Sequence, residues 1–145
     1  MKILRLLKFV PVSLVLSMGI ILPNWAEAPS IPIPAKLQSD PLVLNGKSGG
    51  TVHSNCGNIS TTPSQIIQVT ESMPYMRLSV DSPGQPTLLI DGPSGRFCVL
   101  ADSYSGNKPE LSGYWRAGKY SLYVGEISEG QYNYTLAISQ QKKPK

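Results

Sequence analysis

Apolar and polar positions alternate along the second half of the chain, in short runs separated by turn-forming residues. In Tyr75–Val80 the apolar side chains of Met76, Leu78 and Val80 alternate with polar ones. Alternation with a period of two over four to eight residues indicates a strand with one buried face. Gly, Pro, Asn and Asp cluster between the runs, and no window has a helical period of comparable strength. The pattern predicts an all-β protein.

Turn signals divide the remaining runs into a hairpin, a long loop and two closing strands. The runs TLLI and RFCVL are joined by the turn-rich segment 91–95, which predicts a β-hairpin. Residues 101–112 are polar and predict the longest loop of the domain, and alternation resumes in 118–124 and 132–139. About eight strands in roughly a hundred residues predict an antiparallel two-sheet β-sandwich over residues 40–140.

A basic and apolar leader precedes the predicted domain. Three basic residues are followed by an apolar run over residues 9–22, and small residues follow at 26–28. This order predicts a secretory signal peptide over residues 1–28. The run is shorter than the roughly 20 apolar residues of a membrane-spanning helix, and Pro11 interrupts it. We therefore expect a secreted or periplasmic protein without a membrane span in its mature form, and an uncleaved membrane anchor is the alternative.

Two short segments flank the predicted sandwich. Three prolines predict that residues 29–39 form a stiff, extended linker, and residues 141–145 form a basic tail that we expect to be solvated. Leader and tail carry six of the 13 basic residues, and the remaining seven are matched by eight acidic residues in the body of the chain. A nucleic-acid-binding domain concentrates positive charge on one face. The body has no such excess, so we exclude nucleic acid as a partner.

The chain contains two cysteines, Cys56 and Cys98. In an exported protein an even pair of this kind predicts a disulfide. Closing a loop of about 43 residues would stabilise the fold by roughly 4 kcal/mol if the effect is entropic. The alternative is a pair of buried free thiols, which a reducing cytosol would favour.

The order of these runs resembles the bacterial pre-peptidase C-terminal (PPC) type of domain. The run SVDSPGQPTLLIDGPSGRFC, the polar loop, the run PELSGYWRAGKYSLYVGE and the closing run YNYTLAIS follow the strands and turns of that family over residues 65–139. The resemblance implies a jelly-roll-like sandwich without catalytic activity, of the kind that occurs in exported proteins beside proteases and other hydrolases. It also implies a candidate ligand, because some relatives bind calcium or extracellular polymers such as collagen.

Candidate calcium ligands lie in and beside the polar loop. Asp102, Asn107 and Glu110 carry side-chain oxygens, and calcium takes six to eight oxygen ligands. Relatives often have consecutive acidic residues at the start of this loop, whereas this chain has the single residue Asp102 there. Asp and Asn are also the residues with which turns satisfy their own backbone groups. We therefore expect no cofactor, with calcium at these three residues as the alternative.

Aromatic residues at the two ends of the polar loop are candidates for ligand binding. Tyr104, Tyr114 and Trp115 do not fit the inward stripe of the predicted strands, and Asn107 lies between them in the sequence. Exposed aromatic side chains beside a polar loop can dock a peptide or stack on a sugar ring. For Trp115 we favour the alternative, in which the indole is a core residue that plugs the end of the sandwich.

No combination of residues predicts catalysis. His53 is the sole histidine, and Cys56 is better explained by a bond to Cys98. A catalytic triad would need a nucleophile, a base and an orienting acid together. The sequence therefore predicts a non-catalytic binding or accessory module at the cell surface or in the periplasm, which contacts an extracellular polymer or a partner protein. A structural domain without a small ligand is the alternative, and the oligomeric state is left open.

Overall fold

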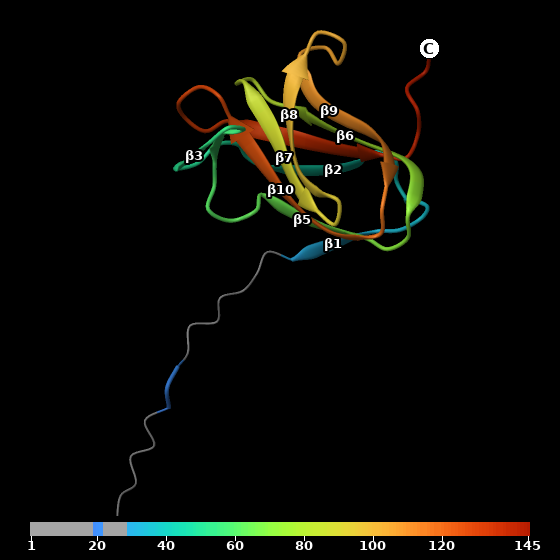
Figure 1. The fold of residues 1–145 in the computed structure, drawn as a ribbon, viewed down its shortest axis with the longest axis horizontal. Coiled ribbons are helices and arrows are strands. Elements are labelled where there is room, and N and C mark those ends of the chain that lie inside the picture. Colours follow the sequence, from blue (N-terminus) through green and yellow to red (C-terminus); the bar gives the residue numbers. More distant parts are fainter. Residues whose placement is uncertain (1–18, 22–28) are drawn as a thin grey trace, which may run out of the picture.

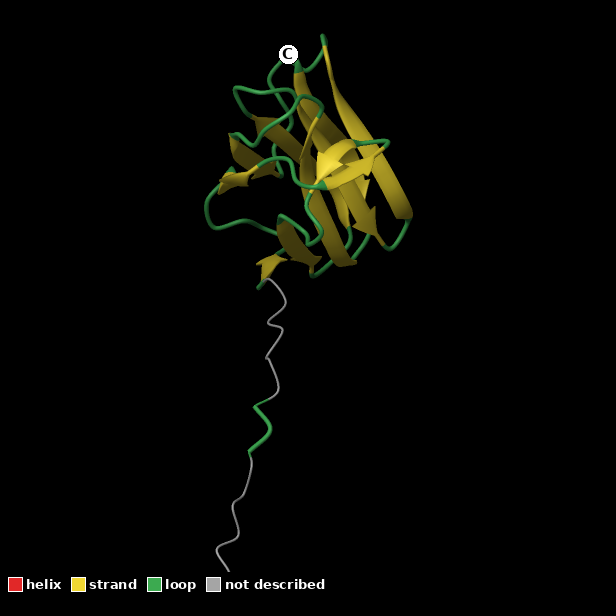
Figure 2. Ribbon diagram, turned by 90° about the vertical axis from the view of Figure 1, so that its left-hand side faces the viewer, coloured by secondary structure: helices red, strands yellow, loops and turns green. Residues whose placement is uncertain are grey.

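The computed structural model describes residues 19–21 and 29–145 of the 145-residue chain. The predicted signal peptide, residues 1–28, lies outside these residues except for positions 19–21. The described chain contains strands and loops but no helix, which confirms the all-β class (Figures 1 and 2). Within the same residues, no segment has the helical length and hydropathy needed to cross a membrane.

Eleven strands of the described chain form two layers, more than the eight or so that the sequence predicts. They are β1 (Ser30–Ile33), β2 (Leu42–Lys47), β3 (Val52–Ser54), β4 (Gly57–Ile59), β5 (Gln65–Val69), β6 (Met73–Asp81), β7 (Pro86–Gly92), β8 (Gly95–Asp102), β9 (Lys108–Trp115), β10 (Gly118–Glu126) and β11 (Asn133–Ser139).

One layer, sheet A, has the strand order β1-β5-β10-β7-β8, with β4 beside β10 and β3 beside β4. The other layer, sheet B, has the order β9-β6-β11-β2. Strands β8 and β9 join the two layers into one curled sheet. The chain changes layer at seven of the ten connections between consecutive described strands, and the three exceptions are β3–β4, β4–β5 and β7–β8. Every pairing between strands is antiparallel except that of β1 with β5.

The facing sides of the two sheets enclose one apolar core. On β6, the predicted inward residues Met76, Leu78 and Val80 are all fully buried. Leu78 lies between Leu111 of β9 and Ile138 of β11 in the strand register. Full burial of such a side chain stabilises the fold by about 1.5–3 kcal/mol. Alternation therefore predicts the buried face of β6 correctly.

Strand β7 is buried on both faces, and this explains why its apolar run is continuous. Leu88 and Ile90 face the main core, whereas Leu89 packs in a smaller cluster with Cys56 and Ile59. Cys98 lies beside Leu89 in the β7–β8 register and is bonded to Cys56, with a Cα–Cα distance of 5.6 Å. The structure thus contains the disulfide that the sequence predicts. The bond fastens the β3–β4 hairpin to the outer face of sheet A.

The segment predicted as a linker, residues 29–39, is in part a strand. Ser30–Ile33 pair in parallel with Ile66–Val69 at the edge of sheet A, and Ile33 is fully buried. Proline lacks a donor and is therefore excluded from central strands, but an edge strand tolerates it. The prolines predicted the extended backbone correctly, but the segment is not a linker, because it pairs with β5. The sandwich begins at residue 30 and not at residue 40.

Residues 34–41 close one open side of the sandwich. The side-chain amide of Gln140 donates to the Pro34 carbonyl oxygen (2.7 Å) and accepts the N–H of Leu37 (2.8 Å). The Asp40 carboxylate accepts the Ser139 hydroxyl (2.6 Å) and the Gln140 N–H (2.8 Å). These bonds hold the β1–β2 connection against the end of β11.

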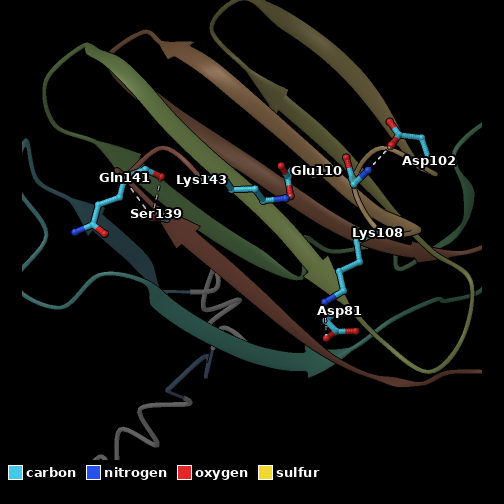
Figure 3. Close-up of polar contacts among 8 residues, drawn as sticks. Asp81, Asp102, Lys108, Glu110, Ser139, Gln141 and Lys143 are labelled. Atoms are coloured by element: carbon cyan, nitrogen blue, oxygen red, sulfur yellow. Dashed lines mark hydrogen bonds and ion pairs between the residues drawn. The ribbon is translucent and has the colours of Figure 1, made fainter. Parts of the chain in front are cut away.

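The basic tail, residues 141–145, makes specific contacts on the outer face of sheet B. Lys143 Nζ lies 2.7 Å from Glu110 Oε2 on β9 (Figure 3). Lys142 Nζ lies 5.7 Å from the centre of the Tyr75 ring. Exposed contacts of these kinds contribute about 0–1 kcal/mol each. The tail, predicted to be solvated, is therefore held weakly against the domain.

Candidate binding groove

The predicted polar loop, residues 101–112, is mostly a β-hairpin. Strand β8 continues to Asp102 and β9 begins at Lys108, so that the turn comprises residues 103–107. Asp102 Oδ1 accepts the Ser105 N–H at 2.8 Å (Figure 3). Asn107 has a φ of 60° and donates its N–H to the Asp102 carbonyl oxygen at 2.8 Å. Asp and Asn thus build the turn itself, as such residues commonly do.

The residues expected to bind a ligand do not form one site. Tyr104 is 98% exposed in the turn, together with Asn107. Tyr114 is 68% exposed but lies near the other end of β9. Six residues of strand separate Tyr114 from the start of β9, a distance of about 20 Å. A single small ligand cannot contact both ends of this strand.

Trp115 is a core residue, as we favoured from the sequence. Its side chain is 4% exposed and its Nε1–H donates to the Met76 carbonyl oxygen at 2.9 Å. The indole meets the Tyr120 ring edge-on, with ring centres 5.0 Å apart. Trp115 can therefore contribute to a binding site only as a buried residue at the base of the site.

The three candidate calcium ligands are each engaged in other contacts. Asp102 and Asn107 hold the turn, and Glu110 pairs with Lys143 (Figure 3). In the part of the chain that the structure describes, no group of three or more His, Cys, Asp or Glu side chains could hold a metal ion.

Adding calcium is therefore expected to leave the melting temperature of the domain unchanged to within about one degree, because only a ligand with a site on the folded state shifts unfolding. The check is a thermal melt in oxidising buffer with calcium, with magnesium and with a chelator. A rise of several degrees with calcium that Asp102→Asn abolishes would contradict this expectation.

A groove opens between β8 and β9. The two strands pair at the hairpin tip, where Ala101 lies opposite Pro109 and Asp102 opposite Lys108. Away from the tip β8 follows β7 in sheet A, whereas β9 follows β6 in sheet B. The strands therefore diverge, and the hairpin projects at the top of the view in Figure 1. The cavity between them has a volume of about 240 Å³.

The groove is apolar inside and carries a positive charge at one end. Phe97 from β8 forms one wall and Leu111 from β9 the other, above the buried side chains of Ile90 and Tyr120. Phe97 is 47% exposed although it is a large apolar residue. Arg116 is the one charged residue that contributes to the described lining. The groove can therefore accept an apolar side chain and an anionic group beside it.

Tyr120 fixes the position of the arginine backbone at this end. Its hydroxyl donates to the Arg116 carbonyl oxygen at 2.7 Å. Burial raises the pKa of the Tyr120 hydroxyl, and the bond to Arg116 opposes this in part. Because a raised pKa favours the neutral form, the hydroxyl is a donor throughout the physiological pH range.

The wall residues Phe97, Leu111 and Arg116 were not found from the sequence. Phe97 belongs to an alternating run that looks like any half-buried strand. Its exposure follows from the position of β8 at an edge, which depends on pairings between distant segments. His53 is not part of the groove, since it lies on β3 with Nδ1 2.6 Å from Asn58 Oδ1.

The fold is shared with a known class of domain. The pre-peptidase C-terminal domain of a collagenase from Bacillus anthracis superposes with a TM-score of 0.51 at 19% sequence identity, over 80% of this chain and 100% of that domain. PliG of Aeromonas hydrophila, a periplasmic inhibitor of g-type lysozyme, superposes with a TM-score of 0.45 at 15% identity, over 80% of this chain and all of that one. The protein has a PPC-like fold, as the resemblance of its sequence predicts.

The sequence also has a relative that matches most of its length, although no family model matches the chain. An uncharacterized protein of Synechococcus elongatus is 40% identical over 129 residues, which span 86% of this chain and 92% of that protein. The chain belongs to the same family as this protein.

Proposed function

We propose that this protein is a non-catalytic binding module that works outside the cytoplasm, at the cell surface or in the periplasm, and that it docks a partner through the β8–β9 groove. The observation that carries the proposal is the asymmetry of the sandwich. One side is closed by residues 34–41, which Gln140 and Asp40 hold in place. The other side is joined only at the tip of the β8–β9 hairpin, and the groove below the tip presents Phe97 and Tyr114 to solvent.

Exposed apolar side chains beside an unclosed edge carry a cost, because water must solvate them. Soluble proteins rarely keep a contiguous apolar patch without a use for it, and such patches often mark sites of interaction. Phe97 on β8 and Tyr114 on β9 both line the groove and are 47% and 68% exposed. A partner that covers them would gain the transfer free energy of this surface.

The disulfide supports the proposed compartment. Bonds between cysteines persist in oxidising environments and are rare in the cytosol. Cys56 is fully buried and its partner Cys98 lies on the exposed edge strand β8. The bond therefore stabilises the strand that forms one wall of the groove, in the setting that the predicted signal peptide also favours.

Site-specific photo-crosslinking in the producing cells tests this function. A photoreactive amino acid at position 97 is expected to crosslink an extracytoplasmic partner, whereas the same amino acid at position 43 is not. The two positions are matched, since Phe97 and Val43 are both apolar strand residues with 47% exposure. Val43 lies on β2, away from the groove. Equal crosslinking at both positions, or none at position 97, would favour the structural alternative.

A further inference from the structure

Within the part of the chain that the structure describes, the backbone groups of β8 that face the groove have no partner strand away from the hairpin tip. Pro109 lacks an N–H, so its pair with Ala101 is a non-hydrogen-bonded one, and the even-numbered residues on either side of Ala101 bond across the hairpin. Bonding direction alternates along a strand. The N–H and C=O groups of Cys98 and Arg96 therefore point into the groove, beyond the last paired position.

The geometry of the β7–β8 hairpin independently indicates that the even-numbered residues of β8 direct their backbone groups into the groove. Gly92 and Gly95 close a two-residue turn, so the odd-numbered residues of β8 bond to β7 and the even-numbered ones face away. On the opposite wall the same alternation along β9 turns the backbone groups of Ser112 and Tyr114 toward the groove. Two free strand edges thus face one another across an apolar cavity.

This arrangement fits a single extended segment better than a second copy of the domain. A segment inserted between the edges would bond to β8 on one side and to β9 on the other. The β8 strand of a second copy could not do this, because β7 occupies its other edge. Free strand edges are known to accept peptides in this manner.

The volume of the cavity and the charge beside it indicate which side chains the bound segment would carry. A volume of about 240 Å³ is smaller than the roughly 300–1,000 Å³ of most small-molecule sites, and it is of a size for one large apolar side chain. Arg116 is exposed at the end of the groove, with no described acidic residue in the lining. An acidic group of the segment would pair with it.

We infer that the groove binds an extended peptide segment of a partner protein as an added strand between β8 and β9, with an apolar side chain in the cavity and an acidic side chain toward Arg116. The inference rests on the proposed function and names the chemistry of the partner.

The probe is a phage-displayed library of linear heptapeptides, selected on the oxidised domain, followed by synthesis of the enriched peptide with a fluorescent label. The substitutions Ser112→Pro and Ser112→Ala form a matched pair. Both remove the hydroxyl of an exposed residue, but only proline removes the N–H that an added strand would use. Thermal melts confirm that each variant is folded.

We expect enriched peptides that carry an apolar residue and an acidic residue. Ser112→Pro should weaken binding about tenfold, and Ser112→Ala less than about twofold, since one strand hydrogen bond is lost in the first variant alone. Arg116→Gln should weaken binding by roughly fivefold and remove the preference for an acidic residue. Hydrogen exchange by NMR should slow at the amides of Arg96, Cys98, Ser112 and Tyr114, but not at the free edge of β2.

Three outcomes would overturn the inference. The enriched peptides could bind Ser112→Pro as tightly as the wild type, or the four groove amides could exchange at unchanged rates. The domain could instead form a dimer that Ser112→Pro dissociates, which would make a second copy the occupant. Crosslinking at position 97 together with any of these results would leave the proposed function standing, so that the two can fail separately.

Discussion

Replacing Cys56 and Cys98 together by alanine is expected to lower the free energy of unfolding by about 4 kcal/mol. The two residues are 42 positions apart in the sequence, and the bond limits the freedom of this loop in the unfolded chain. The bond also fixes the β3–β4 hairpin, whose residue Ile59 covers Leu89 on the outer face of sheet A. A domain of this size should lose roughly 12–20 °C in melting temperature.

Urea unfolding monitored by tryptophan fluorescence measures this loss. The wild-type domain in reducing buffer is the matched control, since it loses the bond but keeps both sulfur atoms. We expect the double variant and the reduced wild type to unfold at similar urea concentrations. The double variant should unfold at a slightly lower concentration, because the alanine at position 56 also leaves a space in the smaller apolar cluster. A double variant that unfolds within about 1 kcal/mol of the oxidised wild type would show that packing alone holds the hairpin.

Trp115→Ala is expected to cost about 3–5 kcal/mol, the range for removing a large aromatic side chain from a core. The substitution removes the ring contact with Tyr120 and leaves the Met76 carbonyl oxygen without the indole donor. The cavity it leaves would open onto the groove, because Trp115 forms part of the groove wall.

Two further substitutions separate the contributions of Trp115. Trp115→Phe keeps most of the apolar volume but not the Nε1–H, and should cost less than the alanine variant by at least about 1 kcal/mol. Tyr114→Ala, at the exposed neighbour, should change stability by less than about 0.5 kcal/mol. If Trp115→Ala were as mild as Tyr114→Ala in urea unfolding, the indole would not be part of the core.

Local pattern predicted those parts of the fold in which one face of a strand is buried. The alternation of Met76, Leu78 and Val80 and the turn between Gly92 and Gly95 are encoded within a few residues, and both are present. The continuous run of β7 did not reveal its second buried face, because the covering hairpin comes from residues about 30 positions earlier in the chain.

The candidate site could be predicted only in part, because its position depends on which strands lie at the edges of the two sheets. Tyr114 is exposed as the pattern suggested, and Trp115 is buried as we favoured. Phe97 and Arg116 became candidates only once β8 and β9 were seen to enter different sheets. The polar residues in 108–112 resembled a loop because one face of β9 is exposed to solvent. That these residues form a strand becomes clear only from their pairing with β6.

The repeated passage of the chain between the two layers makes folding a collective event. Strands β6, β9 and β11 of sheet B are each connected in sequence to strands of sheet A, so neither layer is a contiguous stretch of polypeptide that could form first and wait for the other. Such a chain should unfold in one cooperative step. If a protease cuts the chain within one of the connections between β5 and β10, no group of strands that forms a complete layer remains on one fragment. We therefore expect proteolysis there to degrade the domain completely instead of leaving a stable fragment.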